Sequence, residues 1–114
     1  MEPIVEQDVW FANFPYEEDS SKSKPRPVVV IMKSDDELEV LSVKITSHKI
    51  RLKDKFDVAI FKWEEAELDN PSIARVAKTI VLKKEDFRYR IGKLHDDDWN
   101  NIIRKLKDWQ RENN

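Results

Sequence analysis

An arginine between two prolines is the residue of this chain best suited to chemistry. Arg26 lies in the segment Lys24-Pro25-Arg26-Pro27. Each proline fixes its own φ and pushes the residue before it into extended geometry, so the backbone around Arg26 is stiff. A guanidinium held in this way can meet a phosphate with a planar fork of donors. The alternative is an exposed arginine whose aliphatic part packs on the neighbouring prolines.

Two hydroxyl residues follow at the end of a strand-like segment. Residues 38–46 read as a strand, and in their second half apolar residues alternate with Ser42, Lys44 and Thr46. The alternation predicts that Thr46 points away from the core, next to Ser47. Hydroxyls in this position can donate to a phosphate oxygen, or they can close a turn at the strand end.

Candidates for a proton acceptor lie in two loops. The polar segment 16–24 carries Glu17, Glu18 and Asp19. His48 is a second candidate because the reference pKa of histidine lies near neutrality. A lone histidine is more often a surface residue, and a polar segment of this kind is more often a connector. The sequence leaves the choice among these four residues open.

Composition limits the class of protein. The 114 residues suit one domain, residues 1–114, with one modest core. Two separated histidines and no cysteine argue against a metal site, and the single glycine, Gly92, excludes glycine-rich dinucleotide or Walker-type loops, so no cofactor is expected. No apolar run reaches membrane-spanning length and no secretory signal is visible, which predicts a cytoplasmic protein.

Charge is nearly balanced, with 21 basic and 23 acidic residues. This balance argues against a polycation that coats nucleic acid, so any RNA or DNA contact requires a local basic patch. Trp10 and Phe14 can stack on bases, although core packing is the more common role of such aromatics. The cations that can line such a patch are Lys24, Lys44, His48, Lys49, Arg51, Arg75 and Lys78.

Hydrophobic patterns predict a mainly β protein with added helices. The segments read as strands are 8–14, 26–33, 38–46, 56–61 and 73–82, followed by a short extended piece at 89–94. In the fifth strand, Ala74, Val76, Ile80 and Leu82 are expected to share one face, which Lys78 interrupts, and Arg75 is expected on the opposite face. Few helices connect these strands, which favours a small, strongly bent sheet or barrel.

Helical signals are confined to two places. Residues 63–68 have helical composition but are few. A final helix is expected to begin after a cap at His95 or Asp96. Its apolar residues recur at spacings of three and four and predict a stripe that docks on the sheet: Trp99, Ile102, Ile103, Leu106 and Trp109. Gly92 is expected to adopt a positive φ.

Five motifs occur in order along nearly the whole chain: Asp8-Val9-Trp10-Phe11, Lys24 to Val30, Lys44-Ile45-Thr46-Ser47, Pro71 to Val76, and Ile91-Gly92-Lys93-Leu94. Taken together, these motifs resemble the PemK/MazF-like toxins. The resemblance implies an SH3-like β-barrel with added helices, a homodimer, and a metal-independent endoribonuclease that cuts single-stranded RNA. It also implies a cognate antitoxin as partner.

The sequence differs from the pattern of that family in three regions. Gln7 stands where many members have glycine. Ser20 and Ser21 precede Arg26 where members usually carry an acidic residue. The strand at 73–78 carries Arg75 and Lys78 rather than the catalytic aspartate of some members.

Metal-free RNA cleavage can use the 2′-OH of the RNA as the nucleophile. Arginine is a poor proton donor, so Arg26 is assigned as an electrostatic clamp on the phosphorus. Thr46 and Ser47 are assigned as donors to a phosphate oxygen or as groups that orient the attacking hydroxyl. A non-catalytic SH3-like module that binds nucleic acid or protein is the alternative, and a chain that has lost catalysis but still pairs with an antitoxin is a third possibility.

Overall fold

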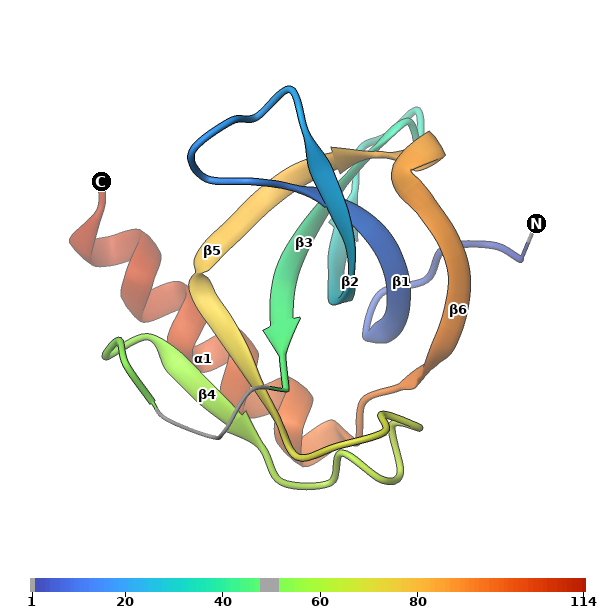
Figure 1. Ribbon diagram of the computed structural model, residues 1–114. Helices are drawn as coiled ribbons and strands as arrows, with labels where there is room; N and C mark the ends of the chain where they lie inside the picture. The colour runs from blue at the N-terminus through green and yellow to red at the C-terminus, as the bar shows by residue number, and fades with distance from the viewer. Residues whose placement is uncertain (1, 48–51) are drawn as a thin grey trace.

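The computed structural model describes residues 2–47 and 52–114. These residues form a mainly β structure with one C-terminal helix, as predicted (Figure 1). The elements are β1 (Asp8–Pro15), β2 (Ser23–Lys33), β3 (Glu39–Thr46), β4 (Asp57–Ile60), β5 (Ser72–Lys83), the 3-10 turn η1 (Lys84–Asp86), β6 (Phe87–Lys93) and α1 (Asp96–Glu112).

One antiparallel sheet contains all six of these strands, in the order β4-β5-β3-β2-β1-β6. Figure 1 shows that the sheet curves strongly, and that β5 and β6 are joined directly through the η1 turn. Pairing among the described residues leaves β4 and β6 at the two edges, so closure into a barrel is not detected. The expectation of a bent sheet is confirmed.

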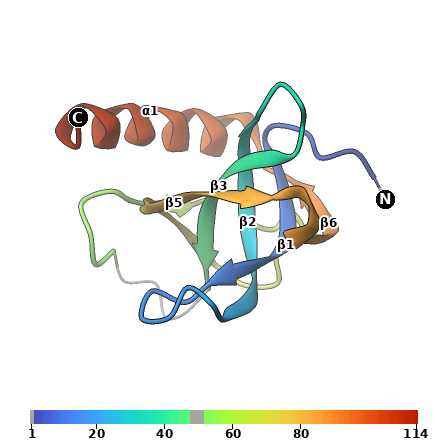
Figure 2. The same cartoon turned by 90° about the horizontal axis from the view of Figure 1, so that it is seen from above.

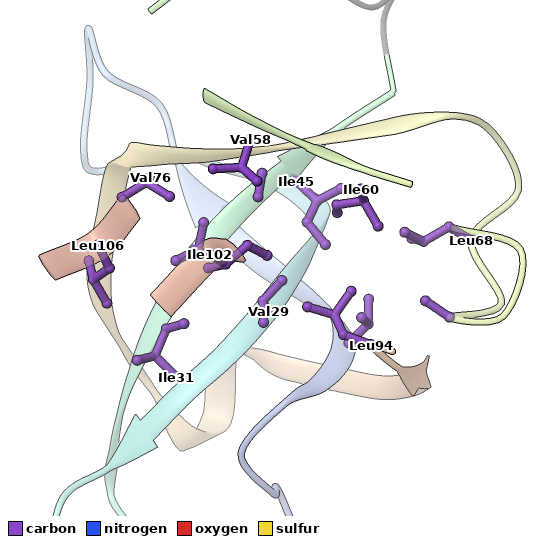
Figure 3. Packing of buried hydrophobic residues seen from close by; sticks show 14 of the residues in the cluster. Val29, Ile31, Ile45, Val58, Ile60, Leu68, Val76, Leu94, Ile102 and Leu106 are labelled. Atoms are coloured by element: carbon purple, nitrogen blue, oxygen red, sulfur yellow. The ribbon is translucent and has the colours of Figure 1, made fainter. Parts of the chain in front are cut away.

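Buried side chains form two separate apolar clusters because successive residues of a strand point to opposite faces of the sheet. The first cluster packs between the sheet, α1 and the segment 61–68, and Figure 3 shows Val29, Ile45 and Ile102 meeting there. The second cluster lies on the opposite face of β1 and β2. Its members are Ile4, Trp10, Ala12, Phe14, Val28, Val30, Val40, Leu82 and Phe87. Trp10 and Phe14 are therefore core residues.

Helix α1 runs along one side of the sheet (Figure 2). The predicted stripe docks as expected: Ile102 and Leu106 are buried in the first cluster, and Trp99, Ile103 and Trp109 pack against it. His95 is the N-cap, and its side chain accepts a hydrogen bond from the backbone N–H of Asp97. In the part of the chain that the structure describes, no helix is long and apolar enough to cross a membrane.

The apolar residues of strand β5 are divided between the two clusters, so the prediction that they share one face is wrong. Thr79 pairs with Val43, whereas Arg75 pairs with the next residue of β3, Lys44. The three residues between Arg75 and Thr79 form a bulge that bends the strand and changes its facing. Ala74 and Val76 consequently join the first cluster, while Leu82 joins the second and Ile80 packs against it.

Two further expectations are corrected. Gly92 has no positive φ; among the described residues, positive φ values occur at Gln7, Glu37 and Glu67, and that of Gln7 is 77°. Gly92 is needed instead for close packing, because a Cβ there would lie 2.3 Å from the carbonyl oxygen of Ala66. The segment 63–68 forms no helix; residues 61–67 form consecutive turns instead.

Candidate nucleic-acid interface

A row of side chains crosses four strands on the face of the second cluster. Val28 of β2 pairs with Lys44 of β3, Lys44 pairs with Arg75 of β5, and Arg75 pairs with Asp57 of β4. Directly paired residues of an antiparallel sheet point to the same face. Lys44, Arg75 and Asp57 therefore lie side by side beyond the edge of the apolar core.

Arg26 and Thr46 lie one step further along the same face. Arg26 is two residues from Val28, and Thr46 is two residues from Lys44. The β2–β3 pairing ends at Val28 and Lys44. If the same register is extended by two residues on each strand, Arg26 lies opposite Thr46. Arg26 is half-buried. Among the described residues no carboxylate forms an ion pair with it.

Thr46 is buried, with 7% of its surface exposed. The expectation that it points away from the core is wrong, because both faces of β3 are covered at this level. Its alternation with Ile45 is nevertheless as predicted: Ile45 belongs to the first cluster and Thr46 faces the other side. Ser47 follows the strand and is exposed. The two hydroxyls therefore differ in how freely a large ligand can reach them.

An open pocket of about 390 Å³ adjoins this face. We call it the charged pocket, because four cations and three carboxylates line it. The bulge of β5 brings Lys78 into it, and the loop before β4 contributes Lys53 and Asp54. Its lining residues are Glu17, Lys44, Lys53, Asp54, Asp57, Arg75, Ala77 and Lys78.

Two of the cations in the charged pocket are neutralised by carboxylates. The Arg75 guanidinium donates to Asp57 Oδ2 at 2.5 Å, and the Asp57 side chain is 1% exposed. Lys78 Nζ lies 2.7 Å from Glu17 Oε1. The hydrogen bond from Lys78 lowers the pKa of the Glu17 carboxyl, which therefore remains ionised near neutral pH. Arg75 and Lys78 are thus weaker candidates for phosphate contacts than the sequence indicated.

Lys44 has no such carboxylate partner in the described part of the chain. Its Nζ lies 5.8 Å from the centre of the Phe14 ring, a cation–π arrangement. Burial lowers the pKa of the Lys44 ammonium, and the nearby Arg26 lowers it further, while Glu17 opposes both effects. Arg26 and Lys44 are neighbours on this face, because Val28, which pairs with Lys44, lies two residues from Arg26 on β2. Unlike Arg75 and Lys78, neither Arg26 nor Lys44 has a carboxylate within ion-pair distance among the residues that the structure describes.

Most of the candidate residues are brought to one face of the sheet. Lys24 is exposed on β2, opposite Phe14 of β1, two residues before Arg26. Glu17 reaches the charged pocket, whereas the Asp19 carboxylate accepts hydrogen bonds from Ser21 instead. His48, Lys49 and Arg51 lie outside the described residues.

Sequence reasoning missed Asp57. The strand that carries Arg75 has no acid, and the acid beside Arg75 comes from the neighbouring strand, β4. The pattern Asp54-Lys55-Phe56-Asp57 contained a signal: carboxylates three apart before a strand are typical of turns in which side chains accept backbone N–H groups. Asp57 Oδ2 accepts from the backbone N–H groups of Lys53 and Asp54, at 2.9 and 3.1 Å.

Comparison with known proteins supports one family. The family model described as the PemK-like, MazF-like toxin of type II toxin-antitoxin systems matches residues 6–109. A mycobacterial endoribonuclease solved in complex with its cognate antitoxin superposes with a TM-score of 0.68 at 14% identity, covering 91% of each chain. The Mycobacterium tuberculosis toxin MazF-mt6 superposes with a TM-score of 0.65 at 18% identity, covering 89% of this chain and 93% of the toxin. No curated protein matches the chain.

Proposed function

Because this chain belongs to the PemK-like, MazF-like toxin family of type II toxin–antitoxin systems, we propose that it is the toxin of such a pair and cuts single-stranded RNA without a metal. The observation that supports this function best is the half-buried Arg26, which lies on the same face as Lys44 and Thr46 and forms no ion pair with a carboxylate of residues 2–47 or 52–114. A cationic face with donors of this kind suits a phosphodiester. The fold expected with this function is an SH3-like barrel, and the strong curvature of the six-stranded sheet is consistent with that fold (Figure 1).

In the proposed reaction, the 2′-oxygen of the RNA attacks the adjacent phosphorus and the bond from phosphorus to O5′ breaks. The products are a 2′,3′-cyclic phosphate and a 5′-hydroxyl. Arg26 stabilises the negative charge on the phosphorus oxygens, and Thr46 and Ser47 donate hydrogen bonds to them. Glu17 is the carboxylate best placed to take the 2′ proton, because it is ionised and lines the charged pocket.

Partners follow from the same proposal. The mycobacterial endoribonuclease above was solved with its cognate antitoxin. We propose that this chain also binds an antitoxin, encoded by an adjacent gene, that it forms a homodimer, and that it acts on RNA in the cytoplasm. Coexpression with the neighbouring reading frame followed by copurification tests the first point, and light scattering on the purified toxin tests the second.

Cleavage of a labelled single-stranded RNA in the presence of EDTA tests the activity. The wild type is expected to give fragments with 2′,3′-cyclic phosphate ends, and Arg26→Ala to lower kcat by about 10²–10³-fold, the usual cost of losing one charge-stabilising donor. Arg104→Ala is the matched control, since Arg104 lies exposed on α1.

A DNA strand of the same sequence separates binding from cleavage. It carries the phosphates but lacks the 2′-OH, so it is expected to bind the basic face and remain intact. If the wild type binds RNA but leaves it uncut, the protein is a binding module rather than a nuclease. If EDTA abolishes cleavage, the metal-independent mechanism is wrong.

A further inference from the structure

Lys44 occupies the centre of the candidate site. Val28 lies beside it on β2 and Arg75 on β5, and its ammonium extends toward the ring of Phe14 on β1. It also lines the charged pocket together with Glu17. Lys44 is therefore the lysine that adjoins both Arg26, the proposed phosphate clamp, and Glu17, the proposed proton acceptor.

The reaction requires a proton donor that the residues considered so far do not supply. When the bond from phosphorus to O5′ breaks, the leaving oxygen becomes a strongly basic alkoxide unless it is protonated. Arginine does not release its proton in a protein. The ammonium of lysine carries three protons and gives one up more readily when it is buried.

We propose that Lys44 is the general acid of the proposed RNA cleavage. As the bond from phosphorus to O5′ breaks, the ammonium of Lys44 donates one proton to O5′ and becomes a neutral amine, while the Glu17 carboxylate takes the proton of the attacking 2′-OH. A proton then returns from Glu17 to Lys44 through solvent, which restores both groups. This inference rests on the proposed function.

The charges around Lys44 favour such a transfer. Arg26 on β2 and Arg75 and Lys78 on β5 all favour its neutral form, in addition to burial, whereas Glu17 favours the ammonium. Asp57 on β4 accepts a hydrogen bond from Arg75, and Lys53 and Asp54 also line the charged pocket. A phosphate bound at Arg26 adds negative charge, which keeps Lys44 protonated until the leaving group departs.

Two RNA substrates test the proposal. The first is an ordinary RNA, and the second carries sulfur in place of O5′ at the cleaved bond. A thiolate leaves without protonation, so a variant that lacks only the general acid still cuts the second substrate. The variants are Lys44→Met, which removes the proton donor, and Lys44→Arg, which keeps the charge but cannot release a proton at ordinary pH. Lys107→Met, at an exposed position of α1, is the control.

Both Lys44 variants are expected to cut ordinary RNA on the order of 10²–10⁴-fold more slowly than the wild type. Both are expected to cut the sulfur-bridged RNA at nearly the wild-type rate. The alkaline limb of the wild-type pH–rate profile is expected to be absent in both variants. Lys107→Met is expected to behave as the wild type, and circular dichroism checks that each variant is folded.

The proposal is overturned if Lys44→Arg cuts ordinary RNA as fast as the wild type, because lysine then supplies charge alone. It is also overturned if the two substrates are slowed equally in Lys44→Met, which indicates a role in binding or positioning. If the wild type cuts neither substrate, the proposed function itself fails, which is a separate result from either of these.

Discussion

The guanidinium of Arg75 donates to the buried carboxylate of Asp57 across the β4–β5 pair, with 2.5 Å between Nη1 and Oδ2. The same carboxylate oxygen accepts two backbone N–H groups from the loop that precedes β4. Arg75 thus anchors that loop and the edge strand to the sheet. The sequence suggests Arg75 as an RNA contact, but in the structure its guanidinium mainly stabilises the fold through Asp57.

Arg75→Ala is expected to lower the free energy of unfolding by about 2–4 kcal/mol, because it leaves the buried Asp57 carboxylate without its partner. Urea denaturation near pH 7 measures this loss. Arg88→Ala, on the exposed side of β6, is the control and is expected to change the free energy by less than about 0.5 kcal/mol. An unchanged unfolding curve combined with weaker RNA binding would show that Arg75 serves the ligand rather than the fold.

Removal of Lys78 should change the pH dependence of RNA cleavage. The hydrogen bond from Lys78 lowers the pKa of Glu17, so Lys78→Met is expected to raise that pKa toward the ordinary value of 4.5. If Glu17 accepts the 2′ proton, the acidic limb of kcat/KM moves to higher pH in this variant. Lys83→Met, an exposed lysine further along β5, is expected to leave the limb in place. An acidic limb that does not move in Lys78→Met excludes Glu17 as the base.

Lys44→Met is expected to stabilise the fold although it impairs the proposed chemistry. The lowered pKa of Lys44 means that the folded state disfavours its charged form, so below the folded-state pKa the ammonium costs stability. Methionine removes that charge and can pack on Phe14. The gain in unfolding free energy is about 0.5 kcal/mol after solvent screening. It should shrink as the pH rises through the folded-state pKa toward 10.5, because wild-type Lys44 then becomes neutral as well. Thermal unfolding at pH 7 and pH 10 measures the trend, and a less stable variant at pH 7 contradicts it.

The parts of this fold that local periodicity determines could be predicted from the sequence. The strict alternation of 41–46 placed Lys44 and Thr46 on one face of β3, and the three-and-four spacing after His95 predicted the docked helix. The prolines beside Arg26 indicated a stiff, extended backbone, and β2 does extend through them. These features depend on residues that are close together in the chain, so the local sequence pattern is sufficient to predict them.

The parts that depend on distant residues could not be predicted. The bulge of β5 comprises Val76, Ala77 and Lys78. Lys78 interrupts the apolar alternation, but it does not reveal that the strand changes face, which becomes evident only in the pairing of Thr79 with Val43. Burial of Thr46 requires knowledge of what covers the end of β3. The ion pair between Asp57 and Arg75 joins residues 18 apart through the order of the strands. Gln7 adopts the positive φ expected of a glycine because its side chain donates to the Leu94 carbonyl and the Asp96 carboxylate.

Gly92 is predicted to adopt a positive φ, but the structure requires a glycine there for close packing instead. Its φ suits any residue, so an alanine there is not opposed by backbone strain. The obstacle is the backbone of Ala66, whose carbonyl oxygen and carbon would lie 2.3 and 2.9 Å from the added Cβ. Gly92→Ala is therefore expected to lower the free energy of unfolding by about 1–3 kcal/mol, the usual cost of overpacking. Lys93→Ala, at the next and exposed position of β6, is the control for urea denaturation. Equal stability of Gly92→Ala and the wild type would mean that the turns at 61–67 move away from β6 at little cost, and that this contact does not hold them in place.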